Sequence, residues 1–111
     1  ADGSFMNVLG DDTWIEGWQS GGAADACGAP VAPHDGSASA SYMYDETAGT
    51  LTISGSGAYL GLAKAVNAGE LPNVDVPDSI TYNVTFTDSS TMEVLIEAGT
   101  GVFWHYKLIK Q

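Results

Sequence analysis

The sequence predicts an all-β fold, an antiparallel up-and-down meander that curls into a barrel. Residues 79–87 alternate apolar and polar side chains, and the apolar ones are Ile80, Tyr82, Val84 and Phe86. A strand with one dry and one wet face needs this period of two. Two further apolar runs follow at residues 91–97 and 102–110, after connections short enough to be hairpin turns. The last third of the chain therefore predicts three strands joined in sequence by hairpins.

The first elements suggest that this barrel is incomplete on its N-terminal side. Asp2-Gly3 is a hairpin-turn signal, and the apolar run at residues 5–9 follows it. A turn normally joins two strands, so we expect a missing upstream strand that would pair with residues 5–9. A frayed terminus at Asp2-Gly3 is the alternative. The next region, residues 10–37, is rich in glycine and proline and predicts a loop, with at most a brief strand around its tryptophans.

Regular structure resumes at residue 39. The alternating segments 39–45 and 50–54 predict a hairpin. Glycines punctuate residues 58–62, which favours a bent or bulged strand. Residues 63–68 predict a helical turn or two that ends at Gly69, and a proline-containing linker covers residues 71–78.

An incomplete barrel would leave two sheet edges open, at residues 5–9 and 102–110. Open edges present unpaired backbone groups to a second chain. The sequence therefore predicts a homodimer that forms through these edges.

Composition narrows the range of partners. The chain has 111 residues, enough for a single domain. Its 14 acidic and 3 basic side chains give a net charge of -11, which repels nucleic-acid phosphate and anionic membrane. No apolar stretch is long enough for a membrane-spanning helix. Cys27 is the single cysteine and fits either a free thiol or half of a bridge to a cysteine elsewhere.

Aromatic and acidic side chains are the candidate ligand contacts. Sugar rings stack their C–H faces on aromatic planes, while neighbouring carboxylates bind the hydroxyls, and binding pockets combine these two features. Core packing is the alternative for each aromatic residue. The candidate ligand-binding residues are Trp14, Trp18, Glu16, Asp12, Tyr59 and Trp104.

The sequence gives no pattern for catalysis or for a metal. Asp11, Asp12, Glu16 and Asp25 could gather around Ca²⁺, but their spacing fits no calcium-loop motif, and a solvated acidic loop is favoured. The two histidines lack a third ligand for zinc. We expect a protein that is not an enzyme and that holds no metal or cofactor.

Several short motifs resemble a known family. Asp2-Gly-Ser-Phe5, Gly49-Thr-Leu-Thr-Ile53 and Trp104-His-Tyr-Lys-Leu108 are similar to the later strands of lipocalin-like (calycin) domains. Asn7-Val-Leu-Gly10, Trp14-Ile-Glu-Gly-Trp18 and Gly57-Ala-Tyr-Leu-Gly61 resemble a domain of exported marine bacterial proteins, some of which carry family 16 glycosidase modules.

This resemblance implies an extracellular or periplasmic protein in a glycan-related setting, with no catalytic motif. It also implies an upstream segment whose cysteine would pair with Cys27. The first functional expectation is a non-catalytic binding or accessory domain that contacts polysaccharide. The alternatives are a lipocalin-like carrier of a small apolar ligand and a structural assembly domain.

Overall fold

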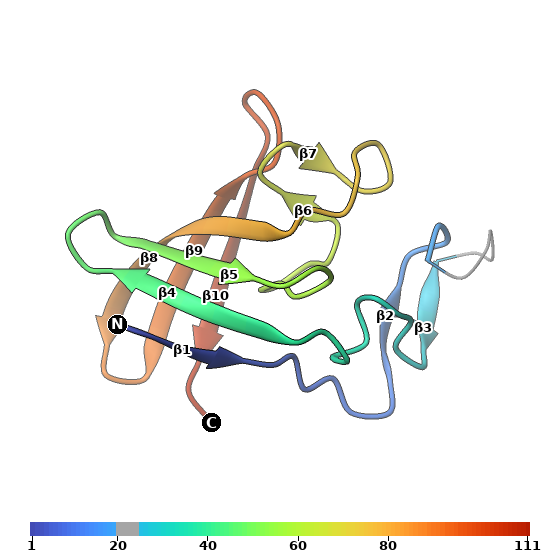
Figure 1. Ribbon diagram of the computed structural model, residues 1–111, viewed down its shortest axis with the longest axis horizontal. Helices are drawn as coiled ribbons and strands as arrows, with labels where there is room; N and C mark the ends of the chain where they lie inside the picture. Colours follow the sequence, from blue (N-terminus) through green and yellow to red (C-terminus); the bar gives the residue numbers. More distant parts are fainter. Residues whose placement is uncertain (20–24) are drawn as a thin grey trace.

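The computed structural model describes residues 1–19 and 25–111, and these residues form antiparallel β-sheets without an α-helix (Figure 1). Part of the predicted loop, residues 20–24, lies outside the described residues. The strands are β1 (Asp2–Phe5), β2 (Thr13–Ile15), β3 (Ala26–Gly28), β4 (Ala40–Asp45), β5 (Thr50–Ser54), β6 (Ala65–Val66), β7 (Gly69–Glu70), β8 (Ser79–Asp88), β9 (Thr91–Glu97) and β10 (Phe103–Ile109). Among the described residues, no helix is long and apolar enough to cross a membrane.

The predicted all-β class and its antiparallel pairing are confirmed. Six strands form one sheet in the order β1-β4-β5-β8-β9-β10, and each pair of neighbours is antiparallel. The strand pairs β2-β3 and β6-β7 lie outside this sheet, and each forms a separate two-stranded sheet. Figure 1 shows the sheet curling, with β9 and β10 behind β4 and β5. The sheet remains open, because β1 and β10 are its end strands, and in the described residues no barrel is closed.

The N-terminal strand lies earlier than its pattern predicts. Asp2 and Gly3 belong to β1 and pair with β4, so they form no turn, and residues 6–9 lie outside any strand. The prediction of a turn was wrong because Gly3 lies in a strand, opposite Tyr42, where the Tyr42 ring leaves no room for a side chain. A Cβ at this position would lie 2.9 Å from Cε1 of Tyr42, so glycine makes room for that ring.

Residues 58–68 also differ from their prediction. Residues 58–62 form no strand, and residues 63–68 contain β6 and a turn in place of the helical turn. The side chain of Asn67, in that turn, makes the decisive contact: its amide donates to the Thr81 carbonyl and its oxygen accepts from the Thr81 N–H, both at 2.8 Å. Pairing of β8 with β9 begins only at Asn83 and Leu95. The Asn67 side chain therefore makes the two backbone hydrogen bonds to Thr81 that a residue of a neighbouring strand would otherwise make.

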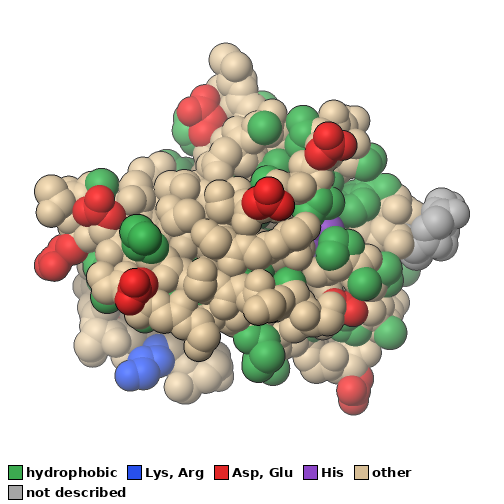
Figure 2. All heavy atoms as spheres, viewed as in Figure 1, with side chains coloured by type: hydrophobic (Ala, Val, Ile, Leu, Met, Phe, Trp, Pro, Cys, Tyr) green, Lys and Arg blue, Asp and Glu red, His purple; other side chains and the backbone are tan. Residues whose placement is uncertain are grey.

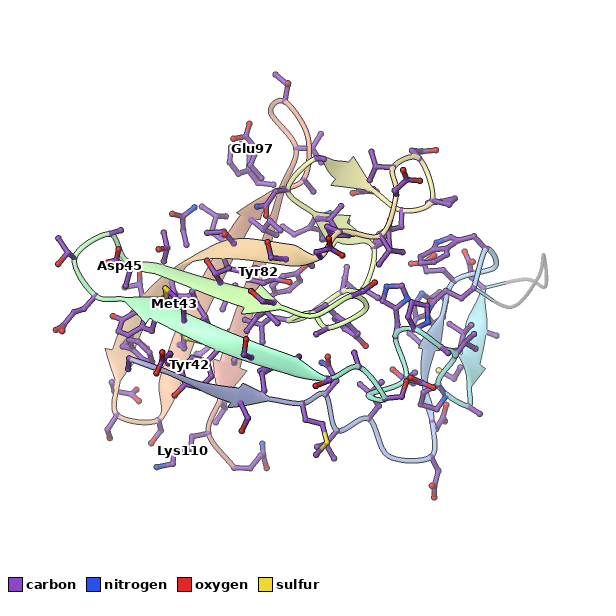
Figure 3. The ribbon with its side chains drawn as sticks, viewed as in Figure 1. Tyr42, Met43, Asp45, Tyr82, Glu97 and Lys110 are labelled. Atoms are coloured by element: carbon purple, nitrogen blue, oxygen red, sulfur yellow. The ribbon has the colours of Figure 1, made fainter. Side chains whose placement is uncertain are left out.

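The core lies on the inner face of the curled sheet, beneath the segment that joins β5 to β8. Alternate residues of β5, β8 and β9 supply its sheet side, and residues 58–71 supply its cover. Tyr82 is fully buried between them (Figure 3), and its hydroxyl accepts a hydrogen bond of 2.9 Å from the Leu60 N–H. The largest fully buried side chains are Tyr82, Ile53, Ile96, Val66 and Val94.

Candidate functional site

A small hollow of about 50 Å³ lies between the β2 region and the segment that covers the core. Its walls combine an aromatic plane, a carboxylate, an amide, an imidazole and an ammonium group. These belong to residues that are distant in sequence, and the fold brings them together by placing the β2-β3 hairpin beside residues 59–64. The polar and aromatic side chains in its lining are those of Thr13, Trp14, Glu16, Gln19, His34, Tyr59 and Lys64.

Strand β2 positions the aromatic wall. Ile15 is buried, so strand alternation turns Trp14 in the opposite direction. The Trp14 side chain remains 50% exposed although it lines the hollow. Glu16 follows the strand, and its backbone N–H donates to the Gln19 side chain at 3.1 Å. Trp14 thus offers an accessible ring beside a polar recess.

His34 is a buried polar wall of the hollow. It is 4% exposed, and its ring meets Trp18 and Tyr59 edge-on, at centroid distances of 5.8 and 6.0 Å. Burial lowers the pKa of His34, and the charge of Asp35 opposes this shift. The Nδ1 atom is buried and has no hydrogen-bond partner among the described residues. His34 therefore contributes a buried ring to the wall of the hollow, and its Nδ1 is not accessible to a group of the size of water.

Lys64 links the hollow to the start of β10. Its Nζ lies 3.8 Å from Glu16 Oε1 and 3.9 Å from Glu70 Oε2, and it also lies 5.0 Å from the centre of the Trp104 ring. The Trp104 indole N–H donates to Glu70 Oε1 at 2.7 Å. The two carboxylates outnumber the one ammonium group, so the network holds Glu16 at the hollow without making the hollow cationic.

The structure places three of the six candidate ligand-binding residues in the wall of the hollow. Trp14, Glu16 and Tyr59 line the hollow directly. Trp18 contacts its His34 wall, and Trp104 joins it only through Lys64. Asp12 is exposed and does not line the hollow.

Sequence reasoning missed four of the polar residues that line the site, Thr13, Gln19, His34 and Lys64. His34 lies in the glycine- and proline-rich run, and Lys64 lies in a segment that predicts a helical turn. Neither position belongs to a motif, so only the folding of the chain reveals that they meet. The one available signal was the rarity of lysine in this chain, which has 3 lysines and arginines together.

The acidic residues near the tryptophans do not assemble into a metal site. In residues 1–19 and 25–111, no three His, Cys, Asp or Glu side chains are grouped to hold an ion. Asp25 Oδ1 instead accepts from the Gly17 N–H at 2.6 Å, and Glu16 pairs with Lys64. Cys27, opposite Trp14 in the β2-β3 pair, is an exposed free thiol.

The burial of His34 predicts a dependence of stability on pH. Its folded-state pKa is lowered, so below about 6.5, the ordinary value, the unfolded chain takes up a proton that the folded chain does not. This contribution is fully present above the ordinary pKa and is lost as the pH falls toward the lowered value. We expect His34→Phe to flatten the acid side of the profile, measured by urea unfolding between pH 7 and 5. His105→Gln, at an exposed histidine, is the matched control. In this variant the free energy of unfolding should depend on pH as it does in the wild type, because His34 is retained.

Comparison of the chain with protein-family models, with curated proteins and with solved structures gives no match. The similarity to lipocalin-like domains therefore stays a prediction from short motifs, and the geometry of the hollow carries the functional argument.

Proposed function

We propose that this chain is a non-catalytic carbohydrate-binding or accessory domain of an exported protein, and that glycan contacts it at the hollow beside Trp14. The observation that carries the proposal is the half-exposed Trp14 ring next to a recess with the imidazole of His34 in its wall. A sugar needs both an apolar plane and hydrogen-bonding groups. Glu16, Gln19 and Lys64 supply further polar groups at the same place.

The size of the hollow defines how a sugar would bind. A volume of about 50 Å³ holds only a few water-sized atoms. A whole sugar ring does not fit, but one hydroxyl or hydroxymethyl group does. The ring would then stack outside on Trp14 while that group enters the hollow and bonds the polar side chains of Glu16, Gln19 or Lys64.

Charge favours a neutral sugar. The chain carries a net charge of -11, which disfavours sulfated or uronic-acid polymers. The one ammonium group in the hollow, that of Lys64, is already flanked by Glu16 and Glu70. We therefore expect a neutral polysaccharide as the partner.

Affinity gel electrophoresis over a panel of neutral and anionic marine polysaccharides tests this function. The wild-type chain should be retarded by at least one neutral polymer, and Trp14→Ala should weaken that retention at least tenfold, about 1.4 kcal/mol. Phe86→Ala is the matched control, because Phe86 is 57% exposed and lies on β8, outside the hollow. Unchanged migration of the wild type over the whole panel would refute the proposal, as would equal retention of both variants.

A second candidate function is the carriage of a small apolar molecule. A recess of about 270 Å³ lies where the β8-β9 turn meets the end of β10, and its apolar wall consists of Phe86, Met92, Leu108 and Ile109. Apolar lining suits a lipid-like ligand. Co-purified lipid in native mass spectrometry, lost in Phe86→Ala and kept in Trp14→Ala, would favour this function over glycan binding.

The barrel belongs to the same proposal. Strands β1 and β10 end a curled sheet, and an upstream strand paired with β1 would extend this sheet toward a barrel. A lipocalin-like barrel of this kind would leave the Trp14 hollow at one end, where a polysaccharide chain has access.

A further inference from the structure

Strand β10 ends the sheet with a long unpaired edge. It spans Phe103–Ile109, and among residues 1–19 and 25–111 its one partner strand is β9. The opposite edge strand, β1, spans only Asp2–Phe5. Natural sheets normally shorten, cover or charge such edges, yet the outer-face side chains at both ends of β10 are exposed and apolar: Phe103 at 56% and Ile109 at 61%.

The register with β9 shows which backbone groups of β10 face outward. The Ala98 N–H donates to the Val102 carbonyl, and the Lys110 N–H donates to the Ser90 carbonyl. Even-numbered residues from 102 to 110 therefore face β9, because bonding direction alternates along an antiparallel strand. The odd-numbered residues Phe103, His105, Lys107 and Ile109 turn their N–H and C=O groups toward the open edge.

We propose that two copies of this chain pair antiparallel through β10, about a twofold axis at Tyr106. This register places Phe103 opposite Ile109 of the partner subunit and His105 opposite Lys107 of the partner subunit. In this register, each of the four residues whose backbone N–H and C=O groups face the open edge lies opposite such a residue of the second copy. An antiparallel ladder requires this arrangement, because opposite residues exchange their N–H···O=C hydrogen bonds. A shift of two residues in either direction would leave some of them unpaired, so this register gives the most hydrogen bonds.

Side chains support the same register. The exposed Phe103 of each copy would pack against the exposed Ile109 of the other copy, so the dimer contains this pair twice. Cross-strand pairs of an aromatic and a β-branched side chain stabilise sheets. The twofold contact is isologous, so it closes at two copies and leaves no edge of β10 for further growth. The association does not depend on the proposed glycan function.

Charge also favours a second copy of this chain at this edge. Of the 14 acidic residues none lies in β10, while Lys107 lies in it and Lys110 follows it. On β9, Glu93 lies opposite Lys107 and its carboxylate is 3.8 Å from His105 Nε2. The edge is thus the least negative long strand of a strongly acidic chain, so two copies approach here with the least repulsion.

Light scattering coupled to size exclusion gives the first test. We expect the wild type to elute as a dimer at 100 µM and Lys107→Pro to weaken association at least tenfold. The Lys107 N–H faces away from β9, so proline removes an edge donor without breaking the β9 ladder. Ile109→Glu, which leaves the backbone unchanged and places a charge against the partner's Phe103, should weaken association in the same direction. A monomeric wild type at 500 µM overturns the proposal.

Cross-linking tests the register itself. In a Cys27→Ser background, Phe103→Cys with Ile109→Cys should give a covalent dimer on oxidation. These positions are about 20 Å apart within one chain, at about 3.4 Å per residue, so no bridge can form inside it. Phe103→Cys with Lys107→Cys is the matched control and should remain monomeric under denaturing conditions, because its cysteines would be diagonal and about 7–8 Å apart. More efficient cross-linking in the control than in the first pair overturns the assigned register.

Discussion

Replacing Tyr82 with alanine is expected to lower the free energy of unfolding by about 3–5 kcal/mol. Tyr82 is fully buried in the centre of the sheet and packs beneath the segment that covers the core. Alanine would leave a cavity and would also leave the Leu60 N–H without its acceptor. A domain of this length has roughly 5–15 kcal/mol of stability in total, so the variant should be close to unfolding. Urea unfolding followed by tryptophan fluorescence measures the loss.

The variant Tyr82→Phe separates the two contributions. It keeps the ring and removes only the hydroxyl that Leu60 bonds, so we expect a loss of about 1–3 kcal/mol. Tyr44→Phe is the matched control, because Tyr44 lies on the same face of the sheet and is only half-buried. An equal loss in both variants would show that the contact with Leu60 does not hold the covering segment in place. Burial raises the pKa of the Tyr82 phenol, so its hydroxyl stays protonated throughout these measurements.

Replacing Gly57 with alanine should be the most damaging of the glycine substitutions, with a loss above about 3 kcal/mol. Gly57 has a φ of 92°, which costs an L-residue roughly 1–2 kcal/mol by itself. A Cβ there would also collide with the carbonyl oxygen of Pro33 and lie 2.7 Å from its carbonyl carbon. Backbone cannot move aside as a flexible side chain can, so the loop that carries His34 would be displaced from the covering segment.

Gly101→Ala is the control for the conformational part of this loss. Gly101 has a φ of 73°, and a Cβ there would meet nothing within 4 Å. We expect it to lose only about 1–2 kcal/mol. The midpoints of thermal unfolding should therefore fall in the order wild type, Gly101→Ala, Gly57→Ala. Equal midpoints for the two variants would mean that the approach of Gly57 to Pro33 does not contribute to stability.

Predictions from local pattern succeeded where a strand has one wet and one dry face. In β8, Ile80, Tyr82 and Val84 are buried and the residues between them are exposed, as the alternation predicts. The strands β4, β5, β9 and β10 begin and end within one residue of their predicted limits. Period-two patterning and short turns are properties of neighbouring residues, so the sequence contains them directly.

Local pattern failed where a distant residue decides the conformation. Gly3 signals a turn, but the ring of Tyr42 requires a glycine in a strand at that position. Residues 63–68 suit a helical turn, but hydrogen bonds between Asn67 and Thr81 fix a hairpin turn there. In both cases the partner is far away in sequence, and its contribution outweighs the weak local preference.

By itself, the sequence determined the all-β class, the hairpins β4-β5, β8-β9 and β9-β10, and the presence of aromatic residues near carboxylates. Only the tertiary structure decided that β5 pairs directly with β8, that Trp14, Glu16 and Tyr59 share a hollow, and that His34 and Lys64 complete it. The reason is physical: a strand's face follows from adjacent side chains, whereas a site follows from how separate segments pack.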